Sequence, residues 1–271
     1  MSLTFSQKIA LAFWCAITLL WVWIQTVGST DGFYNYLYSF LFGLVPFFGG
    51  LMAMWMSRVW GGLKSAVGKA VFFLGLGAFL WGCGENIWSY YNFFLGVPAP
   101  YPSLADLGFA PSIFFYGLGA FYLAKATGAK YALRHPEAKW FVGLAVVAVT
   151  ALSYYVLVIV VRGGVLVPSG ESALKAVLDI MYPLGDFVGL MIGVIVSGLS
   201  FPYLGGRYKM DVFAILAGIG VMFIADSIFS YTTTVGTYYN ANFGDLMLSL
   251  GTFLITFGAL GFKQPALQDE S

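Results

Sequence analysis

Six acidic side chains lie in or at the outer half of long apolar runs, where carboxylates are rare: Glu85, Asp106, Asp179, Asp186, Asp226 and Asp245. The interiors of these runs hold no lysine or arginine that could pair with them. A charge at the centre of a bilayer costs about 2.5–3.5 kcal/mol even on lenient scales. We therefore expect the carboxylates to face the interior of a helical bundle, where they are protonated, hydrated or neutralised by a bound cation.

Two of these acids have the spacing of helix caps. Ser103 precedes Asp106 by three residues, and Asn242 precedes Asp245 by three, each just before an apolar run. This is the arrangement of a capping box, in which side chains satisfy free N–H groups at a helix start. In the simplest interpretation, the two aspartates cap helices and the other acids bind backbone groups freed by proline and glycine.

Two further interpretations assign the acids to a ligand. Oxygen ligands suit hard cations, so the chain could hold calcium or magnesium on Glu85, Asp106, Asp186 and Asp226. Alternatively, carboxylates and aromatic rings together could bind an organic cation such as an amine. The expected ligand-binding residues for either case are Trp81, Glu85, Trp88, Asp106, Tyr182, Asp186, Asp226 and Asp245.

Several other chemistries do not fit the residues present. A single histidine, His135, and two isolated cysteines, Cys15 and Cys83, give no expectation of zinc or haem. A retinal Schiff base needs a lysine in the middle of an apolar run, and none is present. With 13 basic and 12 acidic residues, the chain offers no basic face to nucleic acid.

Membrane-spanning helices are the elements that must position these residues. Of 271 residues, 60% are hydrophobic and 9% are charged, whereas soluble domains carry about 25% charged residues. Runs of roughly 20 apolar residues predict eight spans, over residues 7–27, 34–57, 68–92, 105–125, 139–161, 173–200, 210–232 and 243–262. We expect an all-α integral membrane protein with one transmembrane domain over residues 1–271.

The distribution of basic residues predicts the orientation. The opposite set of connections carries only Arg162 and Lys175. The N-terminus and the second, fourth, sixth and final connections carry Lys8, Arg58, Lys64, Lys69, Lys125, Lys130, Arg134, Lys139, Arg207, Lys209 and Lys263. By the positive-inside rule, both termini lie in the cytoplasm and the protein resides in the cell membrane.

An internal repeat relates two parts of the chain. Residues 85–90 (ENIWSY) match residues 226–231 (DSIFSY), the Asp-Leu pair at 106–107 matches that at 245–246, and the Gly-Ala pair at 119–120 matches that at 258–259. We interpret the chain as four parallel hairpins, over about 7–57, 68–125, 139–200 and 210–262. Because each hairpin starts and ends on the same side, these are not inverted repeats of the kind common in transporters.

Several short motifs resemble those of a family of sensory membrane regions. The motifs are GENIWSYY (84–91), PYPSLAD (100–106), ADSIFSY (225–231), GTYY (236–239) and FGDLMLSLG (243–251). They are similar to the polytopic region that precedes many bacterial diguanylate cyclases, cyclic-di-GMP phosphodiesterases and sensor histidine kinases. The resemblance covers roughly residues 70–262. It touches Glu85, Trp88, Pro102, Ser103, Asp106, Asp226, Gly236, Thr237, Tyr238 and Asp245.

The resemblance implies a signal-sensing membrane module, but this chain departs from the family's pattern in two ways. Glu85 stands where the family more often has aspartate, which keeps the charge. This sequence does not include the family's cytoplasmic output domain, so we expect either that it is the membrane part of a longer protein or that it is a standalone relative whose signal passes to a cytoplasmic partner. We expect a sensor or receptor-like module without catalysis of its own, which binds a cation or cationic ligand in an outward-facing acidic cavity. The alternative is a membrane-embedded enzyme or carrier for a lipid or small solute, with the carboxylates transferring protons.

Overall fold

Eight long helices make up most of the part of the chain that the structure describes. The computed structural model describes residues 3–128, 134–165, 172–200 and 208–262, and within these ranges it contains no strand. Each of the eight is long and apolar enough to cross a membrane, which confirms the all-helical fold and the eight long apolar helices predicted from the sequence. They are α1 (Phe5–Val27), α2 (Phe33–Ser57), α3 (Ala66–Ser89), α4 (Asp106–Ala126), α6 (Pro136–Ser153), α7 (Ala173–Ser200), α8 (Lys209–Thr234) and α9 (Phe243–Gly261).

The ends of the helices follow local sequence signals. Thr4 caps α1 by accepting a hydrogen bond from the Gln7 backbone N–H, and the Gln7 side chain accepts one from the Thr4 backbone in return. Gly28 ends α1 in the left-handed conformation, with φ of 67°. Two spans are longer than their α-helical parts, because α3 continues as a π-helical turn over Tyr90–Phe94 and α6 over Tyr154–Val160.

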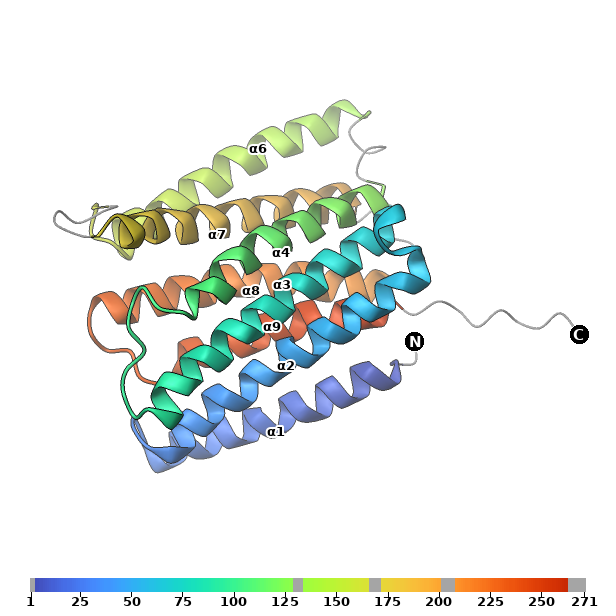
Figure 1. The fold of residues 1–271 in the computed structure, drawn as a ribbon. Coiled ribbons are helices and arrows are strands. Elements are labelled where there is room, and N and C mark those ends of the chain that lie inside the picture. The colour runs from blue at the N-terminus through green and yellow to red at the C-terminus, as the bar shows by residue number, and fades with distance from the viewer. Residues whose placement is uncertain (1–2, 129–133, 166–171, 201–207, 263–271) are drawn as a thin grey trace, which may run out of the picture.

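The helices form an elongated bundle with α1 at one edge and α6 at the other (Figure 1). Hydrogen bonds join the start of α1 to the end of α9. Thr4 Oγ1 donates to the Leu260 carbonyl over 3.2 Å, and Gln7 Nε2 donates to the Phe257 carbonyl over 3.1 Å. The two ends of the described chain therefore lie side by side at one end of the bundle.

Glycines let the helices approach closely within two hairpins, α3–α4 and α8–α9. A Cβ atom at Gly77 would lie 2.8 Å from Tyr116 Cδ1 and 3.1 Å from the Ser112 carbonyl. A Cβ atom at Gly218 would lie 2.7 Å from Ile255 Cγ1 and 2.8 Å from the Gly251 carbonyl. Such close backbone approach is the usual reason for small residues between membrane helices.

These contacts recur at equivalent positions of the two hairpins. A residue of α3 corresponds to the α8 residue 141 positions later, and a residue of α4 to the α9 residue 139 positions later. Gly218 corresponds to Gly77, and their partners Ile255 and Tyr116 correspond as well. Likewise, a Cβ atom at Gly119 would lie 2.8 Å from the Leu74 amide nitrogen, and one at Gly258 would lie 3.1 Å from that of Ile215. The sequence match between the hairpins therefore corresponds to the same pattern of packing.

Candidate functional site

A cavity of about 930 Å³ lies between the two hairpins. Its wall includes residues of α3, α4, α7, α8 and α9 and of the loops that precede α2, α4 and α9. These loops lie at the end of the bundle opposite the start of α1 (Figure 1). The cavity therefore extends from that end of the protein into the space between the helices.

Equivalent positions of the two hairpins form opposite parts of the wall. Seven positions on the helical spans line the cavity in both copies, and they include both acidic positions of the repeat. The pairs are Trp81 and Met222, Glu85 and Asp226, Trp88 and Phe229, Asn92 and Thr233, Asp106 and Asp245, Phe109 and Leu248, and Tyr116 and Ile255. The cavity thus has an approximate two-fold arrangement, in which α3–α4 and α8–α9 present the same faces to one space.

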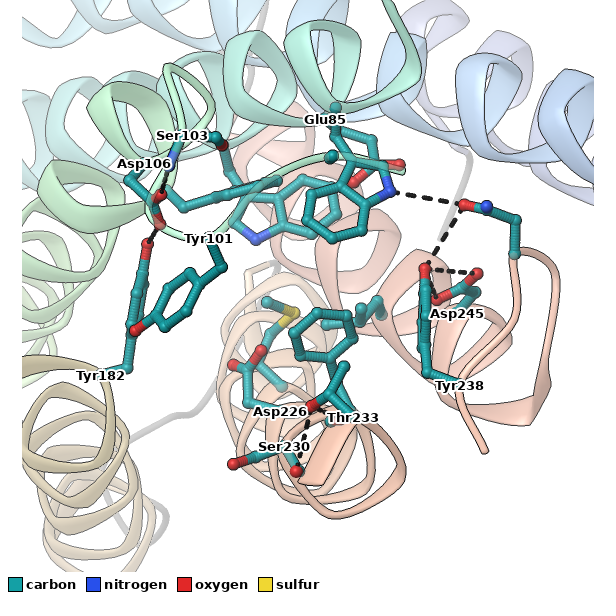
Figure 2. Close-up of a pocket in the computed structure, with 18 of the residues that line it drawn as sticks. Glu85, Tyr101, Ser103, Asp106, Tyr182, Asp226, Ser230, Thr233, Tyr238 and Asp245 are labelled. Carbon is teal, nitrogen blue, oxygen red and sulfur yellow. Dashed lines mark hydrogen bonds between the residues drawn. The ribbon is translucent and has the colours of Figure 1, made fainter. Parts of the chain in front are cut away.

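Asp106 joins the start of α4 to α7. Its Oδ2 atom accepts a hydrogen bond from the Ser103 backbone N–H over 2.7 Å, and its Oδ1 atom accepts one from the Tyr182 hydroxyl over 2.5 Å (Figure 2). The expected reciprocal bond from the Asp106 backbone to the Ser103 side chain is not formed. Instead, Ser103 Oγ accepts from the Ala105 N–H over 3.2 Å. Asp106 therefore closes the turn that precedes α4 and also faces the cavity.

Asp245 has the same two functions at the start of α9. Its Oδ2 atom accepts from the Ala241 N–H over 2.7 Å, and both of its oxygens lie 3.4 Å from the Tyr238 hydroxyl. The Asn242 side chain caps the Asp245 N–H, as the sequence predicts. Ala241 corresponds to Pro102 in the other hairpin, and proline has no N–H. This explains why Asp106 binds the next residue along, Ser103, instead.

Glu85 lies in the middle of a wall of aromatic rings. Its side chain is only 6% exposed, and it is close enough to Asp245 to interact electrostatically. No hydrogen bond reaches the Glu85 carboxylate from any residue that the structure describes. The nearby Trp88 Nε1 donates to Asn240 Oδ1 over 3.4 Å (Figure 2). An unpaired carboxylate in such a place requires a proton, water or a bound cation.

Asp226, the counterpart of Glu85, lies on the α8 side of the cavity (Figure 2). It acts electrostatically on the hydroxyls of Tyr116 and Tyr182. Tyr116 is 8% exposed, and its hydroxyl has no hydrogen-bond partner in the described part of the chain. A buried hydroxyl without a partner is costly, so the cavity offers at least one polar group that a ligand or water would satisfy.

Tyr238 lies in the loop before α9, outside the helical spans. Burial, together with the negative charges of Asp245 and Glu85, raises the pKa of the Tyr238 hydroxyl well above its ordinary value of 10.0. The hydroxyl is therefore a neutral hydrogen-bond donor at physiological pH. Its position between the two carboxylates makes it the counterpart, in role, of Tyr182 beside Asp106 and Asp226.

The structure places seven of the eight predicted ligand-binding residues on the cavity wall. The side chain of the eighth, Asp186, lies outside the part of α7 whose side chains are described, as does that of Asp179. The seven are Trp81, Glu85, Trp88, Asp106, Tyr182, Asp226 and Asp245. Among the described residues, no group of three or more histidine, cysteine, aspartate or glutamate side chains is arranged to hold a metal ion.

Several wall residues were not expected from the sequence. Asn240 accepts hydrogen bonds from Trp88, Ser39 and the Tyr238 hydroxyl through its side chain, and its position corresponds to that of Tyr101, which also lines the cavity. This correspondence within the repeat is the one signal that could have identified both. Arg162 and Lys175 lie at the loop end of the wall, which also contains the five carboxylates Asp31, Glu85, Asp106, Asp226 and Asp245. The described wall is therefore acidic on balance.

No protein-family model matches the chain, and no curated protein or solved structure is significantly similar to it.

Proposed function

We propose that the protein is a receptor-like membrane module that binds an organic cation in the cavity between its two hairpins. The observation that carries this proposal is the presence of buried carboxylates on both walls of one aromatic cavity. A volume of about 930 Å³ is within the range of small-molecule sites, roughly 300–1,000 Å³. Aromatic faces such as those of Trp81, Trp88 and Phe229 attract a desolvated cation.

An organic cation fits the carboxylates better than calcium or magnesium. Both oxygens of Asp106 already accept hydrogen bonds, from Ser103 and Tyr182, and Asp245 is similarly bound by Ala241 and Tyr238. A hard cation needs six or more oxygen ligands in its first shell, so it would have to replace these bonds. An ammonium group can approach Glu85, which has no such bonds among the described residues, and leave the caps in place.

The membrane orientation follows from the basic residues. We infer that the end of the bundle that carries the start of α1 and the end of α9 faces the cytoplasm, so that the cavity opens outward. A ligand that draws the two hairpins together would shift α9, whose inner end is bonded to Thr4 and Gln7 of α1. Such a shift could be recognised by a cytoplasmic signalling partner, as the resemblance to sensory membrane regions suggests.

Thermal unfolding of the purified protein in detergent tests this function. We expect phenethylamine and choline to raise the unfolding temperature more than calcium or magnesium chloride does. Glu85→Gln and Asp226→Asn should each reduce the shift, whereas the exposed Glu137→Gln at the start of α6 should preserve it. If no cation shifts the transition and both cavity variants behave like the wild type, the proposed function is wrong. Uptake of labelled amine into proteoliposomes would instead identify a carrier.

A further inference from the structure

The four acids of the repeat all line the one cavity, two from each hairpin. Glu85 of α3 is close enough to Asp245 of α9 to interact with it electrostatically. The equivalent residues in the exchanged copies are Asp226 of α8 and Asp106 of α4. These two acids are both close enough to the Tyr182 hydroxyl to interact with it. Each hairpin thus supplies one acid to each of the two groups.

A tyrosine hydroxyl lies within each pair. Tyr238 is 3.4 Å from both oxygens of Asp245 and also feels the charge of Glu85. Tyr182 donates to Asp106 over 2.5 Å and also feels the charge of Asp226. The two tyrosines are not related by the repeat, since Tyr182 belongs to α7 and Tyr238 to the loop before α9. A tyrosine hydroxyl bound to one acid and near a second, with one acid from each hairpin, thus occurs twice, and we call each group an acid–tyrosine–acid unit.

Each side also contains a buried polar group that still lacks a partner in the described part of the chain. On the first side this group is the Glu85 carboxylate, which is 6% exposed. On the second it is the Tyr116 hydroxyl, which is 8% exposed and lies near Asp226. Both line the cavity. These unsatisfied groups are independent of the hydrogen bonds within the units, and they indicate that something polar binds on each side.

We propose that the ligand carries two cationic groups joined by an apolar chain, as in a linear diamine, and that each acid–tyrosine–acid unit binds one of them. This rests on the proposed function and specifies its ligand class. The apolar part of the cavity wall, which includes Phe109, Met222 and Leu248, suits a hydrocarbon linker. Joining the two ammonium groups makes the second binding event intramolecular, so that the affinity rises without any new kind of contact.

Diamines and monoamines of matched chain length test whether the site binds one or two cationic groups of the same ligand. Isothermal titration of the protein in nanodiscs should compare α,ω-diaminoalkanes of three to ten carbons with the n-alkylamines of the same lengths. We expect at least one diamine to bind tenfold or more tightly than its monoamine, with affinity passing through a maximum as the chain lengthens. Equal affinities, or affinity that only rises with chain length, would overturn the two-site ligand and leave a single-cation site intact.

Removing the negative charge of one acid in each unit, one unit at a time, tests whether the two units bind the ammonium groups. In both Glu85→Gln and Asp226→Asn, the affinity of the best diamine should fall to that of its monoamine, because only one unit can still bind a charge. The matched control Glu137→Gln should keep the full diamine preference. Retained monoamine binding shows that each variant is folded. If both variants keep the preference, the two units are not the sites. If no amine binds the wild type, the proposed function fails as well.

Discussion

The hydroxyl of Tyr182 on α7 donates a hydrogen bond of 2.5 Å to Asp106 at the first residue of α4. The two residues are 76 positions apart in the sequence, and the bond between them connects α7 to α4 at the cavity wall. This bond uses the Oδ1 atom of Asp106, because the Oδ2 atom already accepts a hydrogen bond from the Ser103 backbone. One side chain therefore binds both the loop before α4 and the neighbouring helix α7.

Loss of this bond should destabilise the protein. We expect Tyr182→Phe to lower the free energy of unfolding by about 1–3 kcal/mol, the usual cost of removing a partner from a charged or buried group. Tyr154→Phe, at a hydroxyl-bearing ring that is 60% exposed, is the matched control and should change stability by less than about 0.5 kcal/mol. Thermal unfolding in detergent measures both. Equal transition temperatures for the two variants would contradict the role of this bond.

The close contact between α8 and α9 predicts opposite effects at two neighbouring glycines. Gly218→Ala places a methyl group 2.8 Å from the Gly251 carbonyl, so the helices must separate, at a cost of about 1–3 kcal/mol. Gly220→Ala meets open space and should be neutral or slightly stabilising, since alanine favours the helix by about 1 kcal/mol. Chemical denaturation in mixed micelles compares them. A stable Gly218→Ala protein would contradict this packing.

The same test can be made in the other hairpin. Gly119→Ala places its methyl group 2.8 Å from the Leu74 amide nitrogen, whereas Gly117→Ala meets open space. If the hairpins pack equivalently, this pair should reproduce the difference seen between Gly218 and Gly220.

Tyr238 predicts a specific dependence on pH. Its raised pKa means that the folded protein keeps the hydroxyl proton, while the unfolded chain loses it near pH 10. The stability that Tyr238 contributes is therefore fully present below about pH 9.5 and is lost as the pH rises further. We expect the difference in unfolding temperature between wild type and Tyr238→Phe to be constant from pH 7 to 9 and to fall above pH 10. A difference that grows above pH 10 would have the wrong sign.

At the other end of the bundle, Gln7 binds the buried Asp211 through a hydrogen bond of 2.8 Å and also donates to the Phe257 carbonyl. Gln7→Ala removes both donors, and we expect it to lower the free energy of unfolding by about 2 kcal/mol. The neighbouring Lys8→Ala, at an exposed position, serves as control. Protease sensitivity of the first helix, followed by mass spectrometry, would show whether α1 separates from α9 as expected.

Helix number and position could be predicted because each apolar run is long enough to cross a bilayer. For example, α4 was expected over residues 105–125 and runs from Asp106 to Ala126. The repeat also identified acids that meet on one cavity, because equivalent positions pack equivalently. Glu85 and Asp226 were selected in this way.

Some residues of the structure could not be predicted from the sequence, because their roles depend on contacts with residues far away in the chain. Asn240 binds Trp88 and Ser39, which precede it by 152 and 201 positions, and no periodic pattern records such pairs. Asp211 was not singled out from the sequence, yet it is buried and bound to Gln7, 204 positions away. Its counterpart in the repeat is Ala70, so the repeat gave no hint of this bond.

The two halves of the cavity are similar but not identical, and the difference gives the site a direction. Glu85 reaches one methylene further than Asp226, and Trp81 faces the space where its counterpart is Met222. A molecule with two unlike ends would therefore have unequal energies in its two orientations and would bind mainly in one of them. Because the two hairpins differ in sequence, as the subunits of a heterodimer do, the protein can distinguish one end of such a ligand from the other.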